Sequence, residues 1–400
     1  MRSVVKVFSS DVVSKVLLGG SGILLIRYMP EGEYAVYTLC FSIISIVSQF
    51  LTGTFDRIFV VGFNRFKIND RIPNFLLLEV AILTLLLLIA FPFAGSVESL
   101  YPLLALLSFA TCIYQFIKVT FQQEMKFSKI FLLELSRAII FSLSIILLIF
   151  TFRYGVKASW VILAQSFGLI MISLVFFSRI KIPLNKFSLA DGFELGCAIF
   201  KGVYSYLVAF VFAASFFSQI NILMLSAMTD SYSVASYGSA YRYFSLLCML
   251  LTAVHVVMLP TVQRVDSHEK MLAIYRDFSK FACCVTPFIL LGMKVSAWLM
   301  PLVDGGKYPQ SITIFQLLSV SALLSFWLSP HINILMKTED FRFLFSSHLI
   351  GLLLFFCLNL VLIPHLSGVG AAVSHLISYF FINMVVFLRS KKILMRMRVC

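Results

Sequence analysis

The sequence predicts an all-α polytopic membrane protein with about twelve transmembrane helices, arranged as two parallel-repeat bundles of six helices. Three features support this fold class: the composition, the recurrence of long apolar segments and the placement of the cations. Of the 400 residues, 60% are hydrophobic and 12% are charged, and the mean hydropathy is +0.98. Because a soluble domain carries roughly 25% charged residues, this chain has too little polar surface to face water on all sides.

Apolar runs long enough to cross a bilayer, about 20 residues each, recur along the whole chain. The first run contains Asp11 and Lys15 and no small-residue cleavage site follows it, so we expect a retained helix and not a cleavable signal. Some runs exceed the minimum length, which predicts tilted or extended helices. The expected helices are 7–27, 35–62, 74–95, 100–121, 130–151, 157–178, 203–228, 236–260, 280–301, 311–335, 342–363 and 369–389.

Lysine and arginine are distributed asymmetrically between the two ends of these helices. With twelve helices, about 24 of the 32 basic residues fall on one side and about four on the other. Cytoplasmic loops carry such an excess of cations, so we expect a multi-pass protein of the cell inner membrane with both termini in the cytoplasm. The net charge of +14 is therefore a topology signal, and no nucleic-acid partner is expected.

The longest hydrophilic stretch divides the chain into halves. It predicts an N-terminal six-helix bundle over 1–180, a cytoplasmic linker over 181–202, and a C-terminal six-helix bundle with a basic tail over 203–400. Short matches between the halves recur at offsets of about 200 to 216 residues, for example Tyr34–Tyr37 with Val234–Tyr237. Six helices is an even number, so both repeats share one orientation, as in transporters whose halves rock about the membrane normal.

Four passages resemble a known family: YMPEGEYAVY at 28–37, NILMLS at 221–226 followed by ASYGSAYR at 235–242, GKY at 306–308 and GVGAA at 368–372. They are similar to motifs of the polysaccharide exporters of the multidrug/oligosaccharidyl-lipid/polysaccharide (MOP, MATE-like) superfamily, most of all the O-antigen (Wzx-type) flippases. The chain departs from the family pattern at Ala35, where glycine is usual, and at Asn221, where aspartate is frequent.

The resemblance implies two bundles that form a V around a central cavity. It implies a flippase that carries an undecaprenyl-diphosphate-linked oligosaccharide, such as an O-antigen or lipopolysaccharide repeat unit, from the cytoplasmic to the periplasmic leaflet by alternating access. H⁺ or Na⁺ would be the coupling ion. Membrane lipids, a polysaccharide polymerase and a chain-length regulator are the further partners expected.

No sequence motif indicates an enzyme, and no cofactor or metal is expected. The chain has no Walker A loop, HExxH, EF-hand or GxSxG motif. None of its eight cysteines forms a CxxC pair or a Cys/His pattern with metal-ligand spacing. We therefore expect a transporter without catalytic residues, driven by an ion gradient or by consumption of its product.

Ionisable residues at membrane depth are the first candidates for a transport site, because their burial in lipid is costly. Arg242 could bind a phosphate in a bidentate manner, although an interfacial Arg that snorkels outward is the alternative. Lys294 lies in the middle of an apolar run, so its side chain is less able than that of Arg242 to reach the membrane interface by snorkelling. The substrate-binding candidates are Arg242, Lys294, Lys15, Arg57, Asn221 and Tyr241.

Three acidic residues are candidates for ion or proton coupling: Asp11, Glu79 and Glu134. Asp11 lies four residues before Lys15, so the two share a helix face and could either line the cavity or neutralise each other. A carboxyl group desolvated in a cavity could take up a proton. For Glu134, the simpler alternative is a salt bridge with Arg137. For Asn221, the alternative to substrate binding is a hydrogen bond between helices.

Two other functional classes remain open. A MATE-like multidrug cation antiporter would share the architecture but would need an acidic, aromatic pocket, whereas the charges at membrane depth here lean basic. A membrane-embedded polysaccharide polymerase or acyltransferase would need catalytic groups in the membrane or outside it, and the expected external loops are all short.

Overall fold

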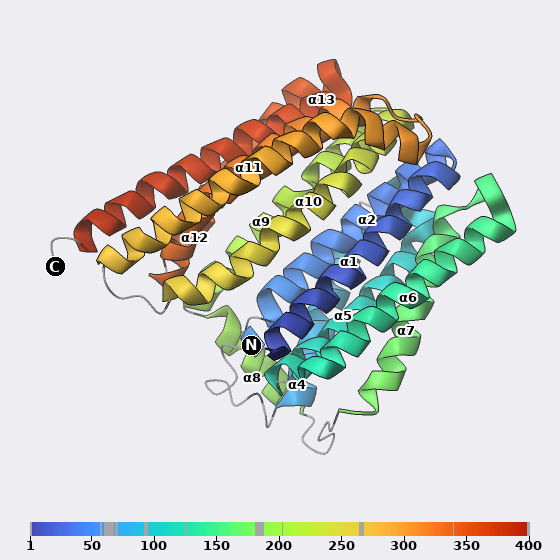
Figure 1. Ribbon diagram of the computed structural model, residues 1–400. Coiled ribbons are helices and arrows are strands. Elements are labelled where there is room, and N and C mark those ends of the chain that lie inside the picture. The colour runs from blue at the N-terminus through green and yellow to red at the C-terminus, as the bar shows by residue number, and fades with distance from the viewer. Residues whose placement is uncertain are drawn as a thin grey trace. The chain divides into compact units, whose positions relative to one another are not determined.

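The structure is a computed structural model that describes residues 2–56, 58–59, 68, 71–91, 95–124, 126–180, 188–201, 203–263, 268–338 and 340–397. In these ranges the regular secondary structure is entirely helical. The chain divides into two compact units, Met1–Gln219 and Ile220–Cys400, with helix α9 (Val203–Met228) containing the boundary between them. Figure 1 traces the helices from the N-terminus to the C-terminus.

Unit 1 contains the first six predicted spans. Its long helices are α1 (Arg2–Tyr28), α2 (Glu31–Leu51), α4 (Ile72–Ala90), α5 (Tyr101–Gln123), α6 (Phe127–Phe152) and α7 (Ala158–Phe177). Short turns lie between them: a π-helical turn, η1 (Thr52–Asp56), continues α2, and 3₁₀ turns η4 (Gly95–Leu100) and η5 (Arg153–Gly155) precede α5 and α7. Two of these helices have a proline in the first turn, where proline is tolerated: Pro73 in α4 and Pro102 in α5.

The helices of unit 1 pack through apolar faces. α1 packs on α6, α5 on α7, and α2 on α5 and α7. Phe59, which follows η1 in the chain, packs on α4 and α5: its ring centroid lies 5.1 Å from that of Phe75 and 6.1 Å from that of Phe116. At the other end of the bundle, the Glu33 carboxylate accepts a 2.7 Å hydrogen bond from the Ala158 backbone N–H and thereby caps α7.

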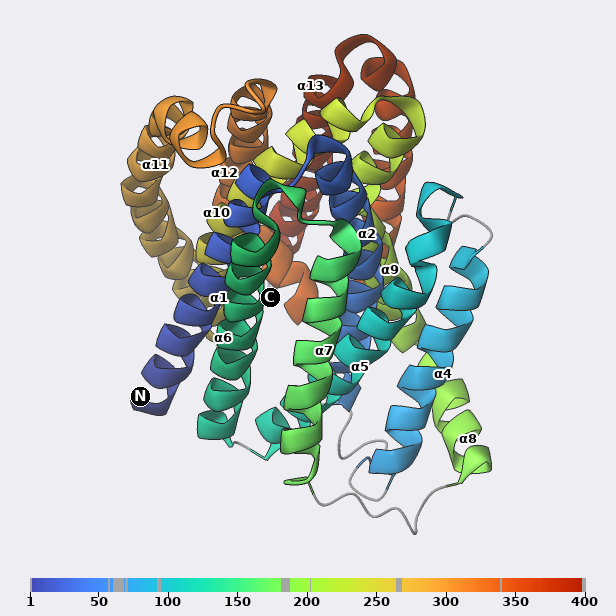
Figure 2. The ribbon, with the colours of Figure 1, turned by 90° about the vertical axis from the view of Figure 1, so that its right-hand side faces the viewer.

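A helix forms inside the segment predicted as a linker. Helix α8 (Leu189–Phe200) begins at Ser188, whose hydroxyl accepts a hydrogen bond from Asp191 N–H as an N-cap. It packs beside the first turns of α4 (Figure 2), where the Ser188 backbone N–H donates to the side-chain oxygen of Asn74 at 2.8 Å. Gly196 allows close contact, because a Cβ there would lie 3.0 Å from Leu78. The sequence had predicted a cytoplasmic linker over 181–202, and no helix was predicted in it.

Unit 2 contains α10 (Ser231–Gln263), α11 (His268–Asp304), α12 (Gln310–Lys337) and α13 (Phe341–Met397). α12 is central: α10, α11 and α13 all pack against it. Asp230 caps α10, accepting a 3.0 Å hydrogen bond from Ser233 N–H, and its hydrogen bonds from the Ser233 side chain and backbone hold the pKa of that carboxyl below its ordinary value. α10 and α11 extend beyond the predicted 236–260 and 280–301.

Helix α13 corresponds to the last two predicted spans. Ser367 has φ 49° and ψ −129°, a conformation that ends one helix and starts another three residues after Pro364. Gly370 is required next to this kink, because a Cβ there would lie 2.3 Å from the Leu362 carbonyl oxygen. Every predicted span therefore corresponds to a helix, with α13 supplying two.

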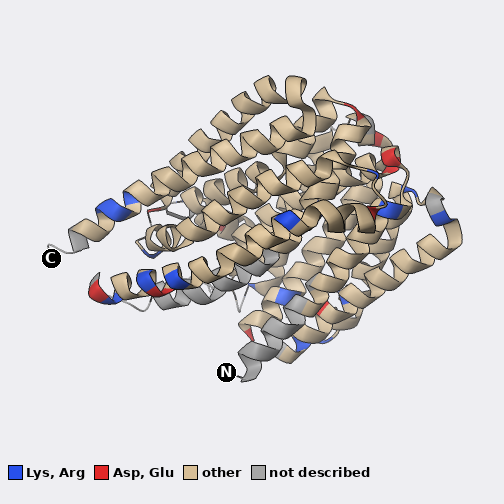
Figure 3. Cartoon of the chain, turned by 45° about the horizontal axis from the view of Figure 1, so that its top comes forward, with Lys and Arg blue, Asp and Glu red and all other residues tan. Residues whose placement is uncertain are grey.

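The helices have the length and composition of membrane spans. Nine helices in the described ranges are long and apolar enough to cross a membrane, counting Phe341–Met395 as one, and a shorter apolar helix covers Val16–Tyr28. Lys, Arg, Asp and Glu lie mainly near helix ends, with long uncharged stretches between them (Figure 3). Many large apolar side chains are exposed on these helices, as expected where the surrounding medium is lipid.

Candidate functional site

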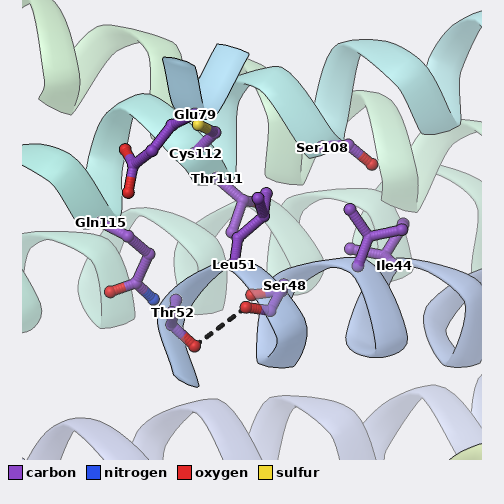
Figure 4. A pocket seen from close by; sticks show the side chains of 10 residues that line it. Ile44, Ser48, Leu51, Thr52, Glu79, Ser108, Thr111, Cys112 and Gln115 are labelled. Carbon is purple, nitrogen blue, oxygen red and sulfur yellow. Dashed lines mark hydrogen bonds between the residues drawn. The ribbon is translucent and has the colours of Figure 1, made fainter. Parts of the chain in front are cut away.

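A small polar pocket in unit 1 contains the predicted coupling residue Glu79. The pocket lies between α2, α4 and α5, and its free space is about the size of one water molecule. Glu79 is 3% exposed and lies about 10 Å along α4 from Ile72 at 1.5 Å per residue. The lining comprises Ile44, Val47, Ser48, Leu51, Thr52, Glu79, Ser108, Thr111, Cys112 and Gln115 (Figure 4).

Most polar groups that line this pocket with Glu79 are uncharged oxygen groups. The Thr52 hydroxyl donates to the Ser48 carbonyl at 2.9 Å, and the Thr111 hydroxyl donates to the Leu107 carbonyl at 2.7 Å. Each hydroxyl has one proton and two acceptor lone pairs. Since the proton is directed at the backbone, the threonine oxygens can act toward the pocket as acceptors. Thr52 is also the first residue of the π-turn η1, and π-bulges occur frequently at functional sites.

The second acidic residue, Glu134, is surrounded by cations. Its carboxylate lies 2.6 Å from Lys118 Nζ and 3.0 Å from Arg137 Nη2, and its side chain is 5% exposed. The Arg137 guanidinium also lies 5.0 Å from the centre of the Tyr114 ring. Two ion pairs of this length favour a fixed, ionised Glu134 that connects α5 to α6.

Asn221 belongs to a buried hydrogen-bond network in unit 2. Its side-chain nitrogen donates to Tyr237 Oη at 2.5 Å and to the Ala371 carbonyl at 3.0 Å. Its side-chain oxygen accepts from Asn359 Nδ2 at 2.8 Å. The network joins α9, α10 and both parts of α13 through uncharged groups, which is the helix-to-helix role left open by the sequence.

Arg242 and Tyr241 are neighbours on α10, and both are half-buried. The Tyr241 ring stacks on Tyr237, with 6.3 Å between centroids and 18° between planes, and contacts Phe244 at 5.7 Å. Tyr241 therefore lies in the middle of an aromatic row along α10, and Arg242 is the next residue of the helix. Tyr237 and Phe244 are buried, so Tyr241 is the half-buried ring of this row.

Lys294 is exposed on α11, a helix that buries one narrow stripe against α12 and exposes Phe288, Leu291 and Trp298 elsewhere. In the described parts of the chain, no carboxylate forms an ion pair with Lys294. Its cation lies on an apolar helix inside the span Glu269–Asp304. The remaining candidates, Asp11, Lys15 and Arg57, lie outside the residues whose side chains the structure describes.

Sequence analysis missed several polar residues that the structure places together. Ser48 with Thr52, and Ser108 with Thr111 and Gln115, recur at spacings of three and four in apolar helices, which puts each set on one helix face. This spacing is the signal that could have identified the pocket. In unit 2, His375 Nδ1 lies 3.0 Å from the Ser321 hydroxyl, buried beneath the stacked Tyr379 ring. Among the described residues no group of three His, Cys, Asp or Glu could hold a metal ion.

The sequence matches no family model and no curated protein. Solved structures show clear similarity. The chain aligns over 96% of its length with 87% of a lipid II flippase, MurJ, in an inward closed conformation, with a TM-score of 0.78 and 12% identity. It aligns over 98% with 98% of an inward-facing multidrug resistance MATE family transporter of the MOP superfamily, with a TM-score of 0.70 and 15% identity.

A third similar structure is a MOP superfamily transporter from Pyrococcus furiosus, described as having a binding pocket of reverse polarity that suggests a different function. The alignment covers 99% of this chain and 96% of that transporter, with a TM-score of 0.62 and 14% identity. The chain thus has the fold shared by MurJ and MATE transporters, and the predicted all-α, MATE-like fold class is confirmed. It is a multi-pass membrane protein.

Proposed function

We propose that this protein is a flippase that translocates an undecaprenyl-diphosphate-linked oligosaccharide from the cytoplasmic to the periplasmic leaflet. The observation that carries the proposal is the similarity of fold to a lipid II flippase, which extends over 96% of the chain. The alignment with this fold leaves little of the chain for a further domain. The proposal therefore assigns no catalytic role and no cofactor to it.

The cations at membrane depth support an anionic cargo. Lys294 lies within an apolar span and no described carboxylate pairs with it, so a phosphate group would relieve the cost of its charge in lipid. Arg242 offers a planar fork of donors that fits two phosphate oxygens. The neighbouring Tyr241 ring could stack on a sugar.

The distribution of cations supports the orientation of the chain on which the proposed direction of transport depends. We place both termini in the cytoplasm of a cell with an inner membrane, because about 24 of the 32 Lys and Arg then lie inside. A lipid-linked unit made in the cytoplasm would be delivered to a periplasmic polymerase and its chain-length regulator. With no nucleotide-binding loop in the sequence, a gradient of H⁺ or Na⁺ would supply any uphill work.

A MATE-like multidrug cation antiporter is the second candidate, and the mutual 98% coverage with a multidrug MATE transporter favours it. The two functions need opposite charges at the cargo site. A lipid diphosphate needs cations such as Lys294, whereas a cationic drug needs carboxylates. The charge of the transported molecule is therefore the property that an experiment must determine.

The test is reconstitution of the purified chain in vesicles that contain a fluorescent undecaprenyl-diphosphate oligosaccharide. Appearance of the probe in the opposite leaflet is followed by its accessibility to a membrane-impermeant quencher. We expect Lys294→Ala and Arg242→Ala to slow translocation about tenfold or more, since each removes one charge-assisted contact with phosphate. Lys280→Ala is the matched control, because Lys280 lies on the same helix, exposed and 3.9 Å from Asp277.

Two results would count against the proposal. Unchanged translocation in both variants would remove Arg242 and Lys294 from the site. Absence of lipid translocation by the wild-type chain, together with uptake of a cationic dye driven by an ion gradient, would favour the antiporter.

A further inference from the structure

A group of cations at one end of unit 1 runs against the charge distribution of the rest of the chain. About four of the 32 Lys and Arg fall on the cation-poor side of the membrane: Arg27, Arg153, Lys157 and Lys307. Cations on this side oppose the orientation that the others favour. Three of the four belong to unit 1, and their concentration there indicates a role for positive charge.

Helices α1 and α6 bring these three cations to one corner. The helices lie side by side (Figure 2), and the Ser21 hydroxyl of α1 donates to the Ser142 hydroxyl of α6 at 2.7 Å. α1 has Arg27 in its last turn and packs on η5, the turn that contains Arg153. Lys157 follows η5 and directly precedes α7. All three cations are exposed at this corner.

The depth of the corner matches that of the lipid headgroups. The membrane spans on either side of the turn are Ser128–Phe152 and Ala158–Phe177. Arg153 and Lys157 therefore lie directly outside the hydrocarbon region, at the level of the phosphate groups. Phe150 near the end of α6 is 81% exposed, which indicates that lipid covers this end of the helix.

Two stacked aromatic rings hold Lys157 at this level. The Trp160 ring of α7 lies 3.9 Å from the Phe152 ring of α6 between centroids, with 32° between the planes. The Lys157 ammonium lies 5.7 Å from the centre of the Trp160 ring, within the range of a cation–π contact. This contact positions the ammonium group without neutralising it, so the positive charge remains available to a ligand.

The two cations of the turn have no carboxylate partner in the ranges that the structure describes. Neither Arg153 nor Lys157 forms an ion pair there. Glu33 of α2 reaches this corner, but its carboxylate accepts the Ala158 backbone N–H at 2.7 Å, and Glu31 is exposed in the first turn of α2. A phosphate group would supply both cations with an anion.

The second repeat shows which features belong to the fold. Its corresponding turn, within α13, contains Ser367 with φ 49° and ψ −129°, close to the φ 48° and ψ −116° of Arg153. The sequence Gly155–Ala158 matches Gly368–Ala371. In this alignment the counterparts of the two cations and of the tryptophan are neither charged nor aromatic: Leu366, Gly370 and Val373. The backbone turn is thus shared, whereas the cations and the aromatic pair are particular to unit 1.

From these observations we infer that the turn between α6 and α7 binds the phosphate group of an anionic phospholipid through Arg153 and Lys157, beside the Trp160–Phe152 pair. Phosphatidylglycerol carries such a group, whereas the phosphate of phosphatidylcholine is neutralised by its own ammonium group. The inference goes beyond the proposed function and requires no transported cargo. Only the leaflet depends on the proposed orientation, in which this turn is periplasmic.

Tryptophan fluorescence offers a local measurement of this binding. Trp160 lies at the site, and the other two tryptophans, Trp298 and Trp327, lie in unit 2. The full-length chain with Trp298→Phe and Trp327→Phe is reconstituted in phosphatidylcholine vesicles that contain brominated phosphatidylglycerol or, in the same amount, brominated phosphatidylcholine. Bromine quenches tryptophan on contact. We expect phosphatidylglycerol to be preferred at Trp160 about 25-fold, from about fivefold for each of two cations near the membrane surface.

Variants at exposed positions separate the site from general effects. Arg153→Gln and Lys157→Gln should each lower the preference about fivefold, and the double variant should have none. Lys157→Arg keeps the charge and should keep the preference. Lys307→Gln is the matched control, because it removes the exposed cation of the same side of the membrane from the turn between α11 and α12, and it should change nothing.

Three outcomes would overturn the inference. The first is equal quenching by the two brominated lipids in the single-tryptophan chain, and the second is a preference that the double variant retains. The third is displacement of the brominated lipid by millimolar inorganic phosphate, since the site would then take phosphate from water and not from a lipid. Lipid translocation is measured separately, so failure of the flippase proposal would leave the result at Trp160 unchanged.

Discussion

Replacement of Glu134 by glutamine should destabilise unit 1 far more than replacement of its nearer partner, Lys118, by methionine. Glu134 is the buried centre of a three-charge cluster, with Lys118 at 2.6 Å and Arg137 at 3.0 Å. Glu134→Gln leaves two cations facing each other across a neutral amide. Lys118→Met leaves a complete pair between Glu134 and Arg137.

The contact distances set the scale of the effect. At an effective dielectric constant near 20, a pair at 2.6–3.0 Å has a Coulomb energy of about 6 kcal/mol, much of which is offset by the desolvation of both ions. Removing one partner of a buried pair costs about 3–5 kcal/mol. The Lys118 and Arg137 side chains are 31% and 27% exposed, and water can partly solvate them, so we expect about 3 kcal/mol for Glu134→Gln. For Lys118→Met we expect about 1 kcal/mol.

Thermal unfolding of the purified variants in detergent measures the difference. For a unit of this size, each kcal/mol corresponds to about 2–4 °C in the unfolding midpoint, which predicts a fall of about 6–12 °C for Glu134→Gln and about 2–4 °C for Lys118→Met. The double variant should be more stable than Glu134→Gln alone, because it removes one of the two uncompensated cations. Equal losses in the two single variants, or a double variant that is the least stable, would refute the view that Glu134 is a fixed structural anion.

Three further changes test other parts of the structure. Asn221→Leu should lower stability by about 2–4 kcal/mol, because it leaves buried polar groups of three chain segments without a partner, and the loss should appear in the unfolding midpoint; no loss would mean that the network is not formed. Gly370→Ala should reduce the amount of folded protein in the membrane, because its Cβ would meet the Leu362 carbonyl at 2.3 Å, whereas Gly292→Ala, where no atom lies within 4 Å, should be neutral. Asp230→Ala should cost about 1 kcal/mol as the loss of an N-cap. Since the folded pKa of Asp230 is lowered, its contribution is complete above pH about 4 and should fade as the pH falls further, which unfolding midpoints between pH 3 and 6 would show.

The helices could be predicted because the bilayer imposes a strict rule on sequence. A chain that crosses lipid must satisfy its backbone internally, so each span appears as an apolar run, and all twelve runs correspond to helices. Even the kink at Ser367 falls between two predicted spans, 342–363 and 369–389. Helix α8 was missed because its apolar face is short and its flanks are hydrophilic: the signals were the N-cap Ser188 and the spacing of Gly192 and Gly196 against α4.

The contacts between side chains of different helices could be predicted less well, because the hydropathy pattern does not determine which helix faces pack together. The pairing of Glu134 with Arg137 follows from their spacing of three on one helix. Its stronger partner, Lys118, is 16 residues away on α5, and no local pattern connects the two. The Asn221 network likewise joins residues up to 150 positions apart.

The two buried glutamates of unit 1 show how neighbours, and not depth, decide what a carboxylate in a membrane can do. Each is the eighth residue of its helix, α4 or α6, and each is less than 5% exposed. Glu134 lies between two cations, so its negative charge is favoured in every state in which those contacts persist. Glu79 lies in a small pocket whose lining includes the hydroxyl groups of Thr52 and Thr111 and the amide of Gln115. Two glutamates at the same position of their helices therefore differ in what surrounds them, because the groups that reach each carboxylate come from other helices, which the sequence next to each glutamate does not specify.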